Sequence, residues 1–163
     1  MSLAPLASLP GDSRVWCFGA SERPSDATIA GLRASMEQFL QTWTAHRADL
    51  RAGFDWLHDR FLVIAVDESD VAASGCSIDA LTGAVRRVEE SAGMTLLDAA
   101  PIWYRDETGA IRQADRDEFR RLAGRGDVGP ETRVFDVTVQ ALEDVRTGAW
   151  EVEAGRSWHA RLL

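Results

Sequence analysis

Hydrophobic residues recur at helical spacing in two long stretches of the chain. The first stretch follows Pro24-Ser25-Asp26, and its apolar side chains lie three or four positions apart at Ile29, Leu32, Met36, Phe39, Leu40 and Trp43. His46 comes three residues after Trp43, so we expect it to extend the same face. The second stretch ends before Gly93, and its apolar residues are Ile78, Leu81, Val85 and Val88. Both patterns predict an amphipathic helix that packs against a core.

Shorter stretches have the composition of β-strands. Residues 14–20, RVWCFGA, are rich in β-formers, and residues 53–59 alternate between apolar and polar side chains. Residues 61–66 are apolar throughout, which is typical of a central strand covered on both faces. Asp59-Arg60 predicts a tight turn that joins the last two strands into a hairpin. Further strands are predicted at residues 101–104, 110–113 and 133–137, and further helices at residues 115–124 and 138–146.

The order of these elements predicts an α+β fold. Strand, helix, strand, strand, helix, strand is the order of a ferredoxin-like, split β-α-β layout, with a mixed or antiparallel sheet, helices packed on one face, and C-terminal additions. Residues 1–13 contain two prolines and a glycine and are expected to form a flexible extension. Residues 14–163 are expected to form a single domain, which is the usual outcome for a chain of 163 residues. Because this layout hosts many functions, the activity has to be inferred from a site.

The charge of the chain limits the classes of partner that the protein is expected to bind. The formal net charge of −8 argues against binding to nucleic acid, which needs a basic face. All 18 basic residues are arginine, so the chain has no lysine for a P-loop or a Schiff base. An acidic surface without lysine also suits a high-salt cytoplasm, where screening reduces self-repulsion. No apolar run is long enough to span a membrane, and the first residues do not resemble a signal peptide, so a cytoplasmic protein is expected.

A candidate site lies at residues 74–79, SGCSID, where the second predicted helix begins. Ser74 and Gly75 let the chain bend, Ser77 is the expected N-cap, and Asp79 would place a negative charge in the first turn. Cys76 has no clear structural duty. It would precede a helix N-terminus, a place that stabilises a thiolate and can bind an anion through free N–H groups.

A nucleophilic cysteine needs a base and a group that orients the base. The candidate bases for Cys76 are His46 and His159, and Asp67 or Asp79 could orient the imidazole. His58 is a weaker candidate because the end of a hairpin is usually exposed.

Two tryptophans accompany the two histidines. Trp43 precedes His46 and Trp158 precedes His159, so the four rings would wall a pocket around Cys76 if the tail folds back on the first helix. The structural alternative is that Cys76 and both tryptophans are packing residues and that Ser77 only caps the helix.

A zinc site is a competing use of the same residue types. Cys76, His46, His159 and an aspartate would suit zinc, but no pair has the close spacing of metal ligands, and we expect no metal or cofactor. Cys17 lies within the first predicted strand, where a free cysteine usually packs as a small apolar residue.

Five short motifs resemble those of a small bacterial family of unknown function. They are Trp43-x-x-His46, Val66-Asp67-Glu68, Ser74-Gly75-Cys76-Ser77-Ile78-Asp79, Val134-Phe135-Asp136 and Ser157-Trp158-His159. The resemblance spans about residues 14–161, and the hexapeptide is its most specific part. Members are sometimes labelled "ABC transporter ATPase", a label that a chain without a P-loop lysine does not support. The resemblance implies no established activity, and it draws attention to Cys76, His46 and His159 as a group.

Two hypotheses about function follow from these observations. In the first, the protein is a small cysteine-dependent enzyme in which Cys76 is the nucleophile and His159 or His46 is the base. In the second, it is a binding module in which the start of the second predicted helix binds an anionic small molecule or a carboxylate of a protein partner. Such a module could be a homodimer. The sequence does not decide whether the protein is an enzyme.

Overall fold

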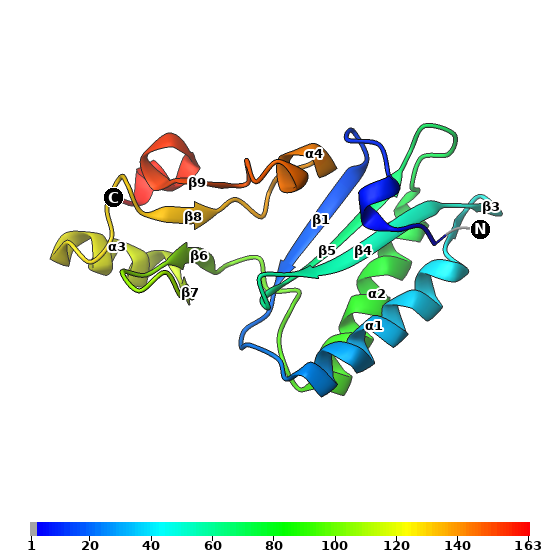
Figure 1. The fold of residues 1–163 in the computed structure, drawn as a ribbon, viewed down its shortest axis with the longest axis horizontal. Helices are drawn as coiled ribbons and strands as arrows, with labels where there is room; N and C mark the ends of the chain where they lie inside the picture. The colour runs from blue at the N-terminus through cyan, green and yellow to red at the C-terminus, as the bar shows by residue number, and fades with distance from the viewer. Residues whose placement is uncertain (1–2) are drawn as a thin grey trace.

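The continuously apolar stretch of the chain forms the central strand of the first sheet. In the computed structural model, which describes residues 3–163, this strand is β5 (Phe61–Asp67), and β1 (Arg14–Gly19) and β4 (Arg51–Leu57) pair with it on either side (Figure 1). Both pairings are antiparallel. All residues from Phe61 to Val66 are buried because the strand is covered on both faces.

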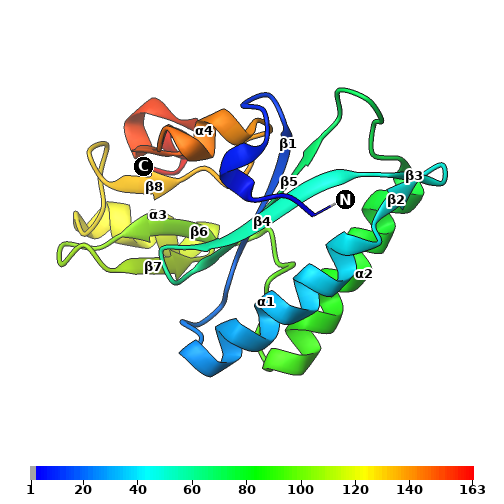
Figure 2. The ribbon, with the colours of Figure 1, turned by 45° about the vertical axis from the view of Figure 1, so that its right-hand side comes forward.

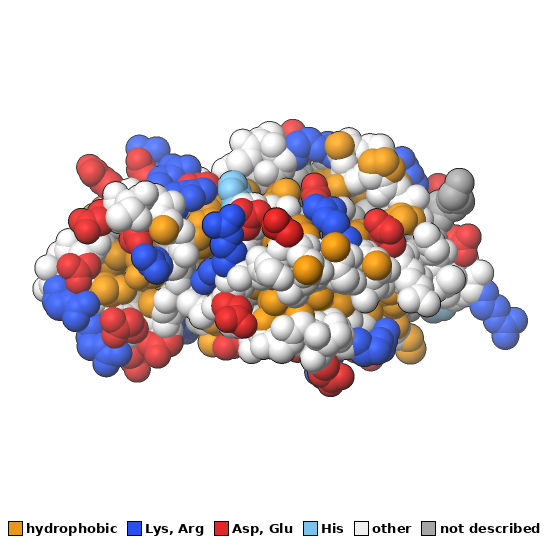
Figure 3. All heavy atoms as spheres, turned by 60° about the horizontal axis from the view of Figure 1, so that its bottom comes forward, with side chains coloured by type: hydrophobic (Ala, Val, Ile, Leu, Met, Phe, Trp, Pro, Cys, Tyr) orange, Lys and Arg blue, Asp and Glu red, His pale blue; other side chains and the backbone are white. Residues whose placement is uncertain are grey.

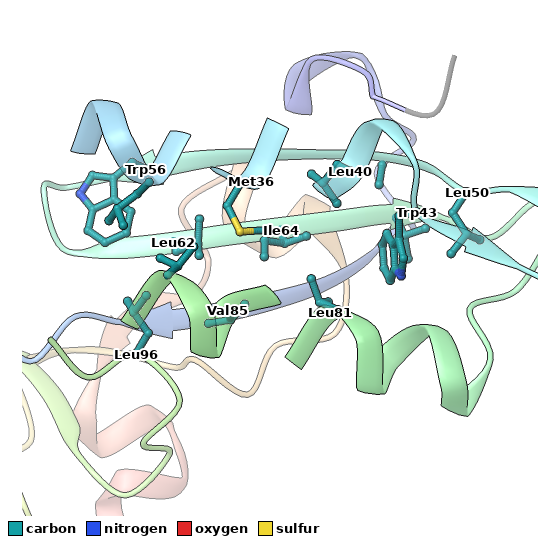
Figure 4. Close-up of a cluster of buried hydrophobic side chains, with 14 of the residues drawn as sticks. Met36, Leu40, Trp43, Leu50, Trp56, Leu62, Ile64, Leu81, Val85 and Leu96 are labelled. Atoms are coloured by element: carbon teal, nitrogen blue, oxygen red, sulfur yellow. The ribbon is translucent and has the colours of Figure 1, made fainter. Parts of the chain in front are cut away.

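Two long helices cover one face of this sheet. They are α1 (Asp26–Gln41) and α2 (Gly75–Ala92), and they lie side by side in both ribbon views (Figures 1 and 2). The core between the helices and the sheet contains Met36 and Leu40 from α1, Leu81 and Val85 from α2, and Leu62 and Ile64 from β5 (Figure 4). The two periodic patterns therefore do mark helices that bury an apolar face.

The other face of β5 packs against the C-terminal half of the chain. Phe61, Val63 and Ala65 point to this side and share a core with Trp103, Phe135 and Trp150. Because side chains alternate along a strand, β5 contributes to one core with its even-numbered residues and to the other with its odd-numbered ones.

The C-terminal half forms a second antiparallel sheet. Its strands, in the order β7-β6-β8-β9, are β6 (Ile102–Arg105), β7 (Ile111–Ala114), β8 (Arg133–Phe135) and β9 (Glu151–Glu153). The remaining helices are α3 (Arg116–Arg125), α4 (Leu142–Arg146) and three short 3-10 helices, Leu6–Ser8, Ala154–Arg156 and Trp158–Leu162. A third sheet is a small hairpin of β2 (Thr44–Ala45) and β3 (Ala48–Asp49). The structure is thus α+β with antiparallel sheets.

The complete ferredoxin-like layout is not shown by the structure. β1, α1, β4, β5 and α2 do follow a split β-α-β arrangement, since β1 and β4 are both antiparallel to β5. The next strand, β6, pairs with β7 and β8 instead of completing the first sheet. The reason is that the C-terminal segment covers the outer edge of β1: the N–H of Val15 donates to the carbonyl of Gln140 at 3.1 Å, and Arg14 bridges Ala141.

The N-terminal segment packs on the first sheet. Of the extension expected at residues 1–13, Met1 and Ser2 lie outside the described residues, while Leu3 bridges Ala52 in β4 and Leu9 is buried. A Cβ atom on Gly53 would lie 2.4 Å from the carbonyl oxygen of Ala4, so only glycine allows this close approach. Within the part of the chain that the structure describes, no helix combines the length and apolar character that a membrane span requires.

Candidate functional site

Ser74, and not Ser77, is the N-cap of α2. Its backbone is extended, and its hydroxyl oxygen accepts the N–H of Ser77 at 3.2 Å. Ser77 is buried, and its own hydroxyl donates back to the carbonyl of Ser74 at 2.8 Å. The expected cap was wrong by three residues because two serines stand one turn apart and only one of them has an extended backbone. Cys76 consequently lies inside the first turn of α2.

Trp43 joins the end of α1 to the start of α2. Its indole N–H donates to the carbonyl oxygen of Ser77 at 2.8 Å, and its side chain is buried. Its ring also packs against Phe39 and Trp16, at centroid distances of 5.7 and 6.3 Å. Trp43 therefore positions the first turn of α2, which carries Cys76.

His46 lies in the turn of the β2–β3 hairpin and not on a helix. α1 ends at Gln41, because Trp43 turns inward and the chain then forms the hairpin. His46 and Arg47 both have positive φ, at 52° and 69°, which a tight two-residue hairpin turn requires of its central residues. The prediction that His46 extends the apolar face of α1 was therefore wrong, and the side chain is exposed.

One hollow of about 600 Å³ brings several of the expected site residues together. His46 and Cys76 both line it, from the hairpin turn and from the first turn of α2 respectively. Other lining residues are Phe39, Trp43, Ser74, Gly75 and Ser77. Cys76 is exposed, so its thiol is accessible to a solute in this hollow. We refer to it as the Cys76 hollow.

His159 and Trp158 lie in a different part of the molecule. They belong to the 3-10 helix at the C-terminus, which Figure 1 places at the opposite end from the β2–β3 hairpin. Trp158 packs against the core of the second sheet, and its indole N–H donates to Asp136 at 3.3 Å. The tail therefore does not fold back on α1, and the expected pocket of four rings does not form.

The contacts of His159 are local. The side chain is 1% exposed, stacks on Trp158 with a centroid distance of 3.8 Å, and has its Nδ1 atom 2.7 Å from the hydroxyl of Ser157. Burial lowers the pKa of His159 below its usual value, and the charge of Asp136 opposes part of this shift. We interpret His159 as a neutral packing residue.

The two aspartates expected to orient an imidazole also have other surroundings. Asp79 is exposed on α2 and does not line the Cys76 hollow. Asp67 accepts hydrogen bonds from the N–H and hydroxyl of Ser69 and pairs with Arg51 at 3.1 Å. The bonds from Ser69 are the main reason why the pKa of Asp67 is lowered.

The two cysteines differ in burial. Cys17 is 9% exposed in β1, and burial, with a smaller effect from Asp136, raises its pKa to about 12. It is therefore an inert packing residue, while Cys76 is open to solvent. Across residues 3–163, no three His, Cys, Asp or Glu side chains are arranged to hold a metal ion.

Sequence reasoning missed the contribution of Phe39 to the site. Phe39 packs against the core, as expected for the apolar face of α1, but it is only partly buried and also lines the Cys76 hollow. The i, i+4 spacing of Phe39 and Trp43 is the signal that could have paired them as one wall.

No model of a known protein family, no curated protein and no solved structure matches this chain. The resemblance based on the SGCSID motif therefore stays a prediction. The class that the structure defines is an α+β protein with a hollow at the start of a long helix.

Proposed function

We propose that the protein is a binding module that takes a small ligand with an aromatic body and an anionic group in the Cys76 hollow. The observation that carries the proposal is the composition of this hollow. It combines the start of a long helix, an exposed thiol, an imidazole and two aromatic rings, and none of its lining residues among residues 3–163 is acidic. In a chain with 26 acidic residues, such a surface favours an anion.

The start of α2 supplies the donors for the anionic group. The N–H groups of the first turn of a helix have no acceptor within the helix. The side chain of Ser74 satisfies that of Ser77, while Gly75 and Cys76 are exposed at N1 and N2. The positive end of the macrodipole of an 18-residue helix adds to their attraction for an anion.

Phe39 supplies an apolar surface for the rest of the ligand, since it is partly buried and lines the hollow. Trp43, which also lines the hollow but is 2% exposed, packs against Phe39 at a centroid distance of 5.7 Å. His46 stands on the opposite element, the β2–β3 hairpin, where its ring N–H can donate to a carboxylate. A flat aromatic carboxylate matches this combination of a ring surface and clustered donors.

The test is an NMR titration with benzoate and with its neutral analogue benzamide. We expect benzoate to shift the backbone amide signals of Gly75 and Cys76 in a saturable manner and to slow the alkylation of Cys76. Benzamide should bind at least tenfold more weakly because it lacks the charge. Equal affinity for the two compounds, or no saturable shift at residues 74–77, would refute the proposal.

Two substitutions at one position sharpen this test. Cys76→Asp puts a negative charge into the hollow at a helix position that favours aspartate, so the fold should be kept while benzoate affinity falls at least tenfold. Cys76→Ser is the matched control and should bind benzoate within threefold of the parent protein. If both variants bind alike, the anion is not held at the start of α2.

A cysteine-dependent enzyme is the second candidate function. It is favoured by one specific observation, which is that His46 lines the same hollow as Cys76 while His159 does not. If His46 acts as the base, His46→Gln should slow the alkylation of Cys76 by iodoacetamide at pH 6 at least fivefold. An unchanged rate would eliminate this candidate and leave the binding function intact. The homodimer remains a prediction, which sedimentation analysis would test.

A further inference from the structure

A second hollow, of about 340 Å³, lies at the tip of the β4–β5 hairpin. Its lining residues include Arg23, His58, Asp59, Arg60 and Arg105, together with residues 109–111 of the β6–β7 turn. The tip is at the opposite end of β4 from the β2–β3 hairpin, so roughly 20 Å of strand separates it from the Cys76 hollow. We refer to it as the arginine hollow.

Two of its three arginines are neutralised by neighbouring carboxylates. Arg23 pairs with Asp59. Arg105 donates through Nε and Nη2 to both carboxylate oxygens of Glu151, at 2.6 and 3.1 Å, and through Nη1 to the carbonyl of Gly109 at 3.0 Å. These two guanidinium groups are therefore held in place by their partners.

Arg60 has no such partner. No carboxylate of residues 3–163 lies within ion-pair distance of its guanidinium, and its Nε atom is buried without a hydrogen-bond acceptor. The guanidinium carbon lies 5.4 Å from the ring centre of Trp103, which is itself buried. Burial and the nearby charge of Arg112 lower the pKa of Arg60, and the charge of Glu22 opposes this. Asp59, the acidic residue of the lining, is paired with Arg23, so the hollow contains one partly desolvated, flat guanidinium that has no ion-pair partner.

His58 and Arg105 add hydrogen-bond donors to the lining of the hollow. His58 has a positive φ of 54°, and its ring packs on Phe135 and Trp150 at centroid distances of 5.4 and 6.0 Å, which places it at the edge of the hollow. Figure 3 shows a face of the molecule on which basic and acidic side chains are interspersed, with a histidine among them. A guanidinium has five N–H donors, so Arg105 keeps donors even while it is paired with Glu151.

We infer that the arginine hollow is a binding site for a phosphate group, with Arg60 as its main ligand and His58 and Arg105 as further donors. The unpaired guanidinium supplies the charge that a phosphate needs, and its planar fork matches two phosphate oxygens. The convergence of several donors favours a tetrahedral, multiply charged group over a carboxylate, which has two oxygens in one plane.

Titration with inorganic phosphate at constant ionic strength, followed by amide NMR signals, tests this inference. We expect saturable shifts at residues 58–60 and 109–111, and any shifts at residues 74–77 should be unaffected by substitution of Arg60. Arg60→Met keeps an apolar stem over Trp103 and removes the charge, and it should weaken phosphate binding at least tenfold. Arg86→Met is the matched control, because Arg86 is exposed on α2 and does not line the hollow, and it should leave the affinity unchanged.

Different results of this titration would refute different parts of the inference. Equal weakening by both substitutions, or no saturable shift at the hairpin tip, would overturn the inference. Acetate binding as tightly as phosphate would overturn the assignment of the phosphate group. Arg60→Lys retains the charge without the fork and should weaken binding about three- to tenfold. Because this variant preserves the charge, it keeps the inference testable if Arg60→Met fails to fold.

Discussion

Trp43 and Trp56 offer a matched pair for measuring what the hydrogen bond at the site contributes to stability. Both tryptophans are buried in the core between the helices and the first sheet, at 2% and 8% exposure. The indole N–H of Trp43 donates to the carbonyl of Ser77, while that of Trp56 is buried and finds no acceptor in the described chain. Replacing each by phenylalanine removes the N–H and leaves a smaller ring.

The two substitutions remove similar packing contacts but have opposite effects on hydrogen bonding. Both lose packing contacts, which costs on the order of 1 to 2 kcal/mol each. Trp43→Phe additionally loses a buried hydrogen bond, at about 1 kcal/mol net, because Ser77 keeps its helical bond. Trp56→Phe removes an unsatisfied donor and so recovers about 1 kcal/mol or more of desolvation cost. We expect Trp43→Phe to be less stable than Trp56→Phe by about 2 kcal/mol.

Urea denaturation of both variants measures this difference directly. The free energy of unfolding is extrapolated to water, and equal m-values in the two variants confirm that the denatured states are comparable. For a chain of this size the difference corresponds to about 4 to 8 °C in Tm. If the two free energies agree within about 0.5 kcal/mol, or if Trp56→Phe is the less stable variant, the assigned role of the Trp43 bond is wrong.

Three further predictions concern packing, thiol access and pH. A Cβ atom on Gly19 would lie 2.2 Å from the Trp103 ring, so Gly19→Ala should lower the free energy of unfolding by about 1 to 3 kcal/mol in a urea titration. A thiol reagent such as DTNB should react rapidly with Cys76 in the native protein and with Cys17 only in denaturant, and two rapid thiols would contradict the burial of β1. Because the pKa of His159 is lowered in the folded state, the unfolded state binds more protons as the pH falls below about 6.5, the ordinary histidine pKa, and stability should fall with it. His159→Gln should reduce this loss, and an unchanged pH dependence would show that His159 is not the cause.

Much of the first half of the fold could be predicted from local pattern. The stretch at residues 61–66 was expected to be a central strand, and all of its residues are buried. The helix at Asp26–Gln41 was expected from its apolar spacing, but its end was placed too far along. The spacing pattern continued to His46, whereas the burial of Trp43 and the hairpin after it ended the helix earlier. The spacing of apolar residues does not indicate where a helix ends when the next element, here the β2–β3 hairpin, begins.

The candidate site was predicted only in part, because the local sequence does not show which residues meet in the folded protein. Ser74 and Ser77 both stand at spacings that suit a cap, and the choice between them depends on which residue takes the extended conformation before α2. His46 and His159 were equal candidates, because nothing in the chain near either one states which lies near Cys76. The structure places His46 beside the same hollow and buries His159 in the second half of the protein.

Local order in the chain thus suffices for the three strands of the first sheet, the apolar faces of the two long helices and the helix start at SGCSID, because hydrophobic period and capping chemistry act over a few residues. The short strands β2, β3 and β9 were not predicted. β6 lies in a separate sheet, and the segment near Gln140 occupies the edge of β1 in its place. The contact of Trp43 with Ser77, and the pairing of Asp59 with Arg23 that leaves Arg60 without an ion pair within residues 3–163, are likewise properties of residues brought together from distant parts of the chain. Such juxtapositions arise from packing two cores on the faces of β5, and only the folded structure specifies them.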